Sequence, residues 1–154
     1  MIARALALLL LAPGPQAALA KKTHVFKEAD GVKVELDVHR PDTADVLPVV
    51  VWIHGGALLM GNRNGIPGRL LELCRKEGFA LVSIDYRLAP QVKLPGIIED
   101  VKDALRWVRE KGPEAARLDP KRIVVTGGSA GGYLTLMTGI AVEPRPTALV
   151  AYWG

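Results

Sequence analysis

The ten residues 123–132, IVVTGGSAGG, decide the fold. The first four are all β-branched, which favours a buried strand, and from Ser129 a helical pattern continues to about Ala141. The junction between the two has the form G-x-S-x-G, with Ser129 at its centre. A strand, this motif and a helix in that order are typical of a nucleophile elbow, a sharp turn that lifts a serine above the carboxyl edge of a sheet.

The glycines at the junction fit this interpretation better than they fit two other glycine-rich turns. Gly127 and Gly131 leave room for the strand and helix backbones to approach each other closely. A phosphate-binding P-loop would need Lys and then Ser or Thr after its second glycine, and no Lys follows Lys121. A dinucleotide-binding G-x-G-x-x-G would need Gly where Ser129 stands. Ser129 is therefore the candidate nucleophile.

Strands are expected on both sides of this stretch. Residues 32–39 alternate apolar and polar, which predicts a half-buried strand, and residues 23–27 are its expected hairpin partner across a turn at Asp30-Gly31. The inward side chains of residues 32–39 should be Val32, Val34, Leu36 and Val38. Continuous apolar runs predict four strands covered on both faces, at 47–53, 79–86, 122–126 and 147–153.

Helical patterns lie between these strands, over residues 66–76, 95–111 and 129–141. The first helix ends at Gly78, and its buried side should carry Ile66, Leu70, Leu73 and Cys74. The second has Pro95 in its first turn and ends at Gly112-Pro113. Buried strands joined by helices predict an α/β fold, a mostly parallel sheet of about six strands with helices on both faces.

A second glycine-rich motif follows the strand 47–53. It reads His54-Gly55-Gly56-Ala57 and matches the H-G-G-G type of oxyanion loop that precedes a nucleophile elbow. Backbone N–H groups of such a loop stabilise the oxyanion of acyl transfer, and loss of one donor costs roughly 10²–10³ in rate. Ala57 replaces the usual third glycine but keeps its N–H, so the loop should function unless that residue needs a positive φ. His54 opens the loop, where a structural role through backbone hydrogen bonds is expected.

Two further motifs lie between the glycine-rich loop and the serine motif. They are the segment DYRLAP, residues 85–90, and the run from Leu94-Pro95 to Glu99-Asp100. From about Leu47 to Gly154 the chain resembles the hormone-sensitive-lipase-like esterase and lipase branch of the α/β-hydrolases. The resemblance implies a serine carboxylic-ester hydrolase that works through an acyl-enzyme and needs no cofactor.

The resemblance also implies residue roles. Ser129 would be the nucleophile, and the oxyanion hole would consist of the backbone N–H groups of Gly56, Ala57 and Ala130. Asp85 and Arg87 map to a structural turn, where we expect a salt bridge that holds the loop. Asp100 is expected to be a helix-terminus or turn partner rather than an acid catalyst.

The triad partners of the serine are not in this sequence. The α/β-hydrolase order is Ser, then Asp or Glu, then His, but after Ser129 there is no His, no Asp and a single acid, Glu143. We therefore expect a C-terminally truncated domain that lacks its final strands, and that is inactive alone because a serine needs a positioned base. Two alternatives stay open: His54 as a substitute base in a short hydrolase, and a non-catalytic ligand-binding or interaction module on the same scaffold.

The first twenty residues have the pattern of a secretory signal peptide. Arg4 precedes an apolar run over residues 5–12, Pro13-Gly14-Pro15 interrupts it, and Ala18-Leu19-Ala20 forms a small-x-small cleavage site. Cleavage after Ala20 would leave residues 21–154 as a partial α/β-hydrolase domain, secreted or periplasmic.

Composition narrows the expected partners. With 154 residues, 49% hydrophobic and 23% charged, the chain has the make-up of a soluble globular domain, and no apolar run reaches the roughly 20 residues of a transmembrane anchor. The 20 Lys and Arg against 16 Asp and Glu are scattered rather than clustered, which argues against nucleic acid. Three isolated His and the single Cys74, expected as buried packing, suggest no metal site. The expected partner is a small-molecule ester, with acetylated carbohydrate as one candidate by analogy with the family.

Overall fold

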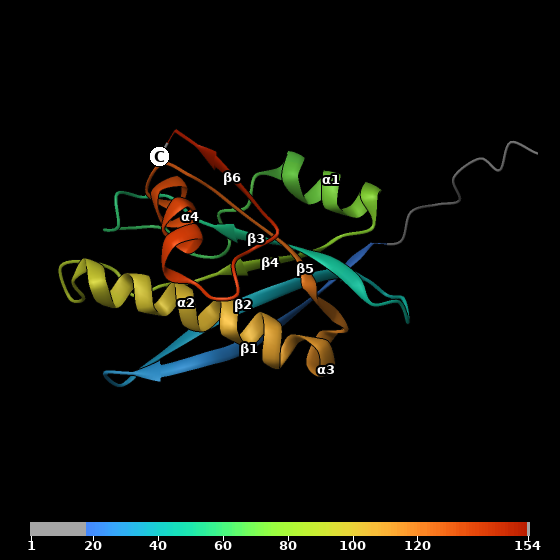
Figure 1. The fold of residues 1–154 in the computed structure, drawn as a ribbon, viewed down its shortest axis with the longest axis horizontal. Coiled ribbons are helices and arrows are strands. Elements are labelled where there is room, and N and C mark those ends of the chain that lie inside the picture. The colour runs from blue at the N-terminus through green and yellow to red at the C-terminus, as the bar shows by residue number, and fades with distance from the viewer. Residues whose placement is uncertain (1–17, 154) are drawn as a thin grey trace, which may run out of the picture.

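A computed structural model describes residues 18–153, which form a six-stranded sheet in the order β1-β2-β4-β3-β5-β6 (Figure 1). β3, β4, β5 and β6 run parallel, whereas the β1–β2 hairpin joins β4 antiparallel. The strands are β1 Leu19–Ala29, β2 Val32–Pro41, β3 Leu47–Ile53, β4 Ala80–Ile84, β5 Leu118–Gly128 and β6 Ala148–Tyr152. The helices are α1 Gly68–Glu77, α2 Leu94–Glu110, α3 Gly112–Ala116 and α4 Ala130–Ala141. The predicted α/β fold is confirmed.

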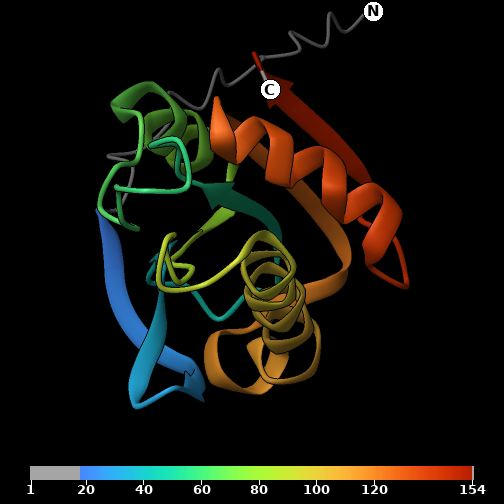
Figure 2. The same cartoon turned by 90° about the vertical axis from the view of Figure 1, so that its left-hand side faces the viewer.

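Successive side chains of β3 pack on opposite faces of the sheet, as the pleat of a strand requires. Val49, Val51 and Ile53 belong to the large core cluster that also contains buried residues of α2 and α4. Val50 and Trp52 pack instead with Cys74 and other residues of α1. Both faces of β3 are therefore covered, which explains its continuous apolar run, and Figures 1 and 2 show the helices on either side of the strands. Cys74 is buried packing, as expected.

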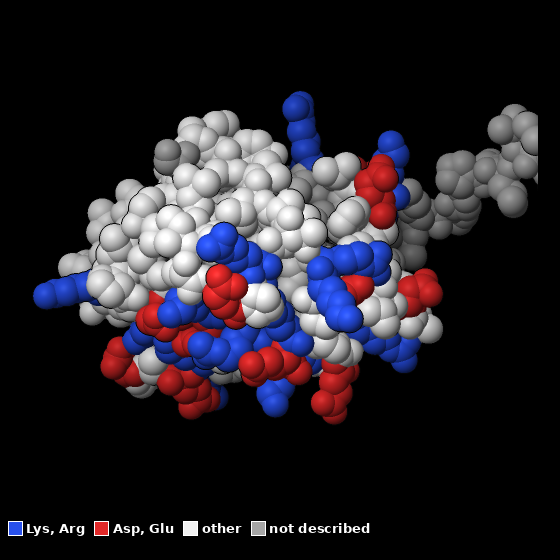
Figure 3. All heavy atoms as spheres, in the orientation of Figure 1, with Lys and Arg blue, Asp and Glu red and all other residues white. Residues whose placement is uncertain are grey.

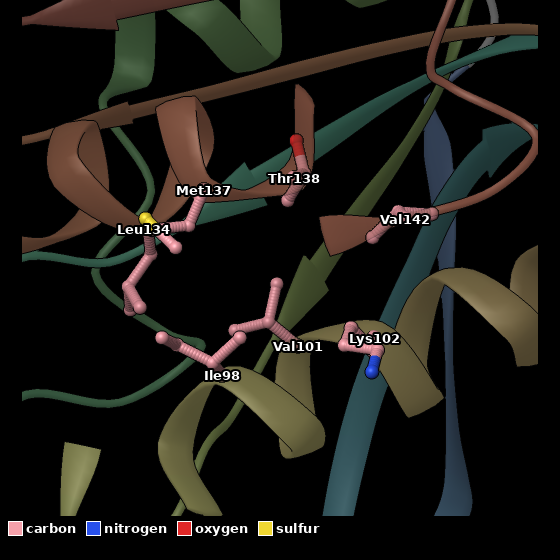
Figure 4. A pocket seen from close by; sticks show the side chains of 7 residues that line it. All are labelled: Ile98, Val101, Lys102, Leu134, Met137, Thr138 and Val142. Atoms are coloured by element: carbon pink, nitrogen blue, oxygen red, sulfur yellow. The ribbon is translucent and has the colours of Figure 1, made fainter. Parts of the chain in front are cut away.

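α2 and α4 lie against each other over a narrow apolar crevice (Figure 4). Ile98 and Val101 of α2 face Leu134 and Met137 of α4 there. The crevice is too tight to admit a water molecule, so it is a packing seam rather than a ligand cavity.

The structure corrects three burial predictions. Val32 is 50% exposed because it is the first residue of β2, beside the hairpin turn. Leu73 is 54% exposed, so the buried side of α1 is narrower than predicted. The third burial correction concerns β6. Apart from burial, one element differs: Gly112-Pro113 ends α2 as expected, but it also begins the short helix α3, which the sequence did not predict.

β6 is the third correction: it was predicted to be covered on both faces, and it lies exposed at the edge of the sheet. Among residues 18–153 no strand pairs with its outer side. A groove of about 490 Å³ beside it is lined by Trp52, Pro67, Arg69, Leu70, Leu73, Gly128, Tyr152 and Trp153. α4 carries no charged residue, and Figure 3 shows a largely uncharged surface over α4 and β6, in contrast to the charged region over α2.

The predicted signal peptide falls mostly on residues 1–17, which lie outside the described part of the chain. Leu19 and Ala20, its last two residues, pair with Pro41 and Arg40 in the hairpin. Within residues 18–153, no helix combines the length and apolar character that crossing a membrane would require.

Candidate active site

Ser129 lies at the junction of β5 and α4, in a backbone conformation that few residues adopt. Its φ is 55° and its ψ is −125°, and it caps the N-terminus of α4. Its N–H donates to the carbonyl oxygen of Tyr152 at 2.9 Å, so pairing with β6 supports the turn. The residue is exposed, and such strained conformations cluster at active sites. Ala130 begins α4, and the N–H groups of a first helical turn have no partner within the helix.

The two glycines that flank the turn are required by the close approach of three backbone segments. A Cβ at Gly127 would lie 2.6 Å from the carbonyl oxygen of Ile53. One at Gly131 would lie 2.7 Å from the carbonyl oxygen of His54. Real side chains do not reach such distances, so β3, β5 and α4 can meet here only because both residues lack a side chain.

The loop that follows β3 lies against this turn. A Cβ at Gly55 would be 3.4 Å from the Cβ of Ser129, so the structure brings the two predicted motifs together. The N–H groups of Gly56 and Ala57 donate no hydrogen bond to any of residues 18–153. Unpartnered backbone donors in a loop that packs against an exposed serine at Gly55 are groups that an oxyanion hole could use.

The sequence left open whether Ala57 needs a positive φ, which would disfavour an alanine. It does, because its φ is 54°. Gly56, Leu58 and Gly61 also have positive φ, at 114°, 64° and 101°. A residue with a side chain pays about 1–2 kcal/mol for the left-handed region, a cost that the usual third glycine would avoid. The loop is thus a strained segment that its surroundings must hold.

His54 supports the loop from within, as expected. Its Nδ1 lies 2.8 Å from the carbonyl oxygen of Gly55, and its ring stacks on Tyr86 with centroids 4.2 Å apart. The Tyr86 hydroxyl donates to the His54 carbonyl oxygen at 2.9 Å. Burial lowers the pKa of His54, and its Nε2 is buried without a partner, so the ring makes no hydrogen bond with Ser129.

Asp85 and Arg87 each form salt bridges, but with partners on different elements. Asp85 accepts a hydrogen bond from the N–H of Arg63 at 2.7 Å and pairs with its guanidinium. Arg87 donates from Nε to Asp100 at 2.8 Å and also pairs with Asp30 of the hairpin turn. Asp85 and Arg87 therefore do not bind each other. Each connects the loop after β4 to a neighbouring segment.

Asp100 is the buried partner of that turn, as predicted. It also lies 2.8 Å from the Nζ of Lys27, on β1. Burial alone would raise the pKa of Asp100, but the hydrogen bonds from Arg87 and Lys27 outweigh it and hold the pKa below its ordinary value. The Asp100 carboxylate is therefore paired with Arg87 and Lys27 and serves a structural role.

Among residues 18–153, no hydrogen bond joins the Ser129 side chain to a group that could act as its base. His24 and His39 are on β1 and β2, and His24 packs against Trp107. Glu143, the only acid after the serine, is exposed and lies 3.4 Å from the Nε of Arg145. Residues 18–153 contain no group of three His, Cys, Asp or Glu side chains that could bind a metal ion.

Sequence reasoning missed Arg63, which anchors the far end of the same loop. Its guanidinium reaches carboxylates on β2 and after β4, and its carbonyl oxygen accepts a hydrogen bond from the Ser83 hydroxyl at 2.6 Å. No local pattern marks this residue, because these partners are 20 or more positions away in the sequence.

The chain is similar to one family model, to segments of curated polyketide synthases and to solved esterases. Residues 36–146 match the model of the BD-FAE family. A non-reducing polyketide synthase of Stereocaulon alpinum is 34% identical in an alignment over 147 residues that covers 86% of this chain and 6% of that protein. One of Emericella nidulans is 33% identical over 147 residues, again 6% of its length. The chain thus spans a small part of these curated relatives.

Solved structures to which the chain is similar include esterases. A bacterial heroin esterase is 34% identical with a TM-score of 0.69, over 80% of this chain and 39% of that one. EstE1, a thermostable carboxylesterase cloned from a metagenomic library, is 33% identical with a TM-score of 0.71, over 82% and 42%. Esterase 2 of Thermogutta terrifontis, solved after phosphonylation by cyclosarin, is 27% identical with a TM-score of 0.73, over 89% and 55%.

Proposed function

The chain belongs to the BD-FAE family of hormone-sensitive-lipase-like α/β-hydrolases, and from that premise we propose that it carries the nucleophile and oxyanion hole of a serine carboxylic-ester hydrolase. Ser129 is the nucleophile, and the N–H groups of Gly56, Ala57 and Ala130 receive the oxyanion. One observation carries the proposal: an exposed serine with φ 55° and ψ −125° lies against the loop at Gly55, and the next two N–H groups of that loop, those of Gly56 and Ala57, have no partner among the described residues.

The chemistry would proceed in two steps. Ser129 Oγ attacks the ester carbonyl carbon, its proton passes to a base, and the carbonyl oxygen becomes an oxyanion held by the loop and the start of α4. Collapse of this intermediate expels the alcohol and leaves an acyl-enzyme, which water then hydrolyses. Unactivated serine is a poor nucleophile, so the step that lacks support in this chain is the removal of the proton.

We propose that the 154-residue chain by itself does not turn over esters at a useful rate. Loss of the histidine base of a serine triad costs on the order of 10⁶ in kcat in the best-studied case. His54 does not fill this role, because its Nδ1 faces the Gly55 carbonyl oxygen and its Nε2 is buried without a partner. External imidazole should therefore increase the rate of Ser129 acylation by acting as the missing general base.

A labelling experiment tests the nucleophile. The chain and its Ser129→Ala variant are incubated with a fluorophosphonate at pH 7.5, with and without imidazole, and the adduct is located by mass spectrometry. The phosphonylated relative of known structure supports this choice of probe. We expect one adduct on Ser129, faster with imidazole, and none in the variant.

Three other results would overturn parts of the proposal. Equal labelling of the Ser129→Ala variant would remove Ser129 from its role. Rapid Ser129-dependent hydrolysis of p-nitrophenyl acetate without imidazole would show that a base is present, and retention of that activity in His54→Gln would exclude His54 as that base. Failure of any label to form in the folded chain would favour a non-catalytic binding module.

The substrate class is a small-molecule ester, and acetylated carbohydrate remains one proposal within it. Release of acetate from an acetylated polysaccharide, measured with imidazole present and compared with Ser129→Ala, would support it. Export through cleavage after Ala20 is likewise a proposal. N-terminal sequencing of the protein recovered from an expressing host would find Lys21 as the first residue if it is correct.

A further inference from the structure

Arg63 lies seven positions beyond Gly56, at the far end of the strained loop, and pairs with three carboxylates. Its Nη2 is 2.8 Å from Glu35 and its Nε is 3.0 Å from Asp37, both on β2. Its Nη1 pairs with Asp85, which also accepts the Arg63 backbone N–H at 2.7 Å. One side chain therefore ties the loop to β2 and to the segment that follows β4.

The loop needs such an anchor. Ala57 and Leu58 have positive φ although they carry side chains, and strained backbone persists only where surrounding contacts over-determine it. On its near side the loop is held by the Tyr86 hydroxyl and by the Ala89 N–H, which donates to the Leu58 carbonyl oxygen at 2.8 Å. Arg63 provides the anchor on the far side.

The charges around Arg63 explain why an arginine is needed. The side chain of Asp37 is 1% exposed, and its second oxygen is 2.8 Å from the Nζ of Lys21. Two cations thus face the three carboxylates of Glu35, Asp37 and Asp85. A planar guanidinium can direct different N–H groups at three acceptors, whereas a lysine ammonium is a point charge that cannot span them. Without Arg63 the carboxylates would repel one another beneath the loop.

We propose that Arg63 is a positioning residue of the oxyanion hole: it holds the Gly56 and Ala57 donors at the serine through the carboxylates of Glu35, Asp37 and Asp85. The proposal rests on the proposed function, since it assigns the loop its catalytic use. A shift of about 1 Å in a catalytic group costs on the order of 10²-fold in rate.

The test compares Arg63→Lys and Arg63→Gln with the unmodified chain and with Arg122→Lys. Arg122 is a matched control because it forms a single exposed pair with Asp119, at the opposite end of β5 from the serine. Each protein is labelled with the fluorophosphonate in the presence of imidazole. Hydrogen exchange is measured at the Leu59 and Met60 amides, which donate to the Gly56 carbonyl oxygen, and at the Ser129 amide.

We expect Arg63→Lys to slow labelling about 10²-fold and to accelerate exchange at Leu59 and Met60 about tenfold or more, with the Ser129 amide unchanged. Arg122→Lys should change neither. Arg63→Gln should have the larger effect; if it does not fold, Arg63→Lys decides the question alone.

Unchanged labelling in Arg63→Lys overturns the proposal, whether or not loop exchange increases, because Arg63 would then serve stability only. Slower labelling with unchanged loop exchange also overturns it, because the effect would not act through the loop. If Ser129→Ala is labelled as fast as the unmodified chain, the proposed function fails instead. The exchange comparison still decides whether Arg63 holds the loop.

Discussion

The two glycine-rich turns of this protein both hold backbone in the left-handed region, but by different means. The turn at Ser129 is held by backbone against backbone: Gly127 and Gly131 let β5 and α4 meet β3 at distances that no side chain allows. The loop at residues 54–61 has close backbone contacts too, at Gly55, Gly56 and Gly61, but it also depends on side chains, through His54, Tyr86 and the ion pairs of Arg63.

The difference teaches which parts of the site tolerate change. The serine turn should resist changes in charge and pH but not an added methyl group. The loop should accept small changes in its own side chains but respond to the loss of distant hydrogen-bonding partners and to titration. Four experiments test this contrast, from the largest expected effect to the smallest.

Gly131→Ala should lower the free energy of unfolding by about 3 kcal/mol or more, because the new Cβ would collide with backbone atoms of β3 that cannot move aside. Urea denaturation followed by circular dichroism measures the change. Gly68→Ala is the control, because a Cβ there has no atom within 4 Å, and it should leave stability within about 1 kcal/mol. Equal stability of the two variants would mean that backbone packing does not hold the serine turn.

Tyr86→Phe should lower the free energy of unfolding by about 1–2 kcal/mol, because it leaves the buried His54 carbonyl oxygen without its donor. The loop amides of Leu59 and Met60 should exchange faster, and the Ser129 amide should not. Tyr152→Phe is the matched control, since Tyr152 is half-exposed and its hydroxyl has no partner among residues 18–153. A loss of protection at Ser129 as well would mean that the two turns are held together rather than separately.

Ala57→Gly should raise the free energy of unfolding by about 0.5–1 kcal/mol, because glycine relieves the strain of a φ of 54° at some cost in unfolded-state entropy. Ala115→Gly, an exposed position in α3, should do the opposite by a similar amount. Thermal unfolding of both variants gives the signs. A destabilised Ala57→Gly variant would contradict the account of strain in the loop.

Acidification should lower the free energy of unfolding, and it should loosen the loop before the serine turn. Burial lowers the pKa values of His24, His39 and His54, so below about pH 6.5 the unfolded chain binds more protons than the folded one. The stability contributed by the neutral rings is complete above that pH and is lost as the pH falls through their folded pKa values. Urea midpoints between pH 7.5 and 5.5 should decrease accordingly.

Acidification should also accelerate hydrogen exchange at the Leu59 and Met60 amides of the loop. His54→Gln should reduce the pH dependence of the urea midpoint and, unlike His24→Gln, should abolish this acceleration. No titratable group lies within the GGSAGG turn, so the Ser129 amide should report no change over the same range. Equal acid sensitivity of both turns would remove the proposed contrast.

Much of the fold could be predicted because it depends on local periodicity. The run LPVVVWI was predicted as a strand over residues 47–53 and forms β3 over Leu47–Ile53, since an apolar run after a proline has few other solutions. The spacing of apolar residues over 95–111 likewise predicted α2, which begins one residue earlier. The predictions that were wrong concern burial: Val32, Leu73 and β6 are exposed because nothing in the described structure covers them.

The candidate site divides in the same way. The sequence by itself determined the serine turn and the H-G-G-A loop, because each motif is a short run in which the glycines dictate the backbone. Only the tertiary structure decided how the loop is held: Arg63 meets Glu35, Asp37 and Asp85 because the order of β2, β4 and β3 in the sheet brings them together. Ion pairs between residues far apart in sequence depend on distance in space, and local spacing carries no information about that distance.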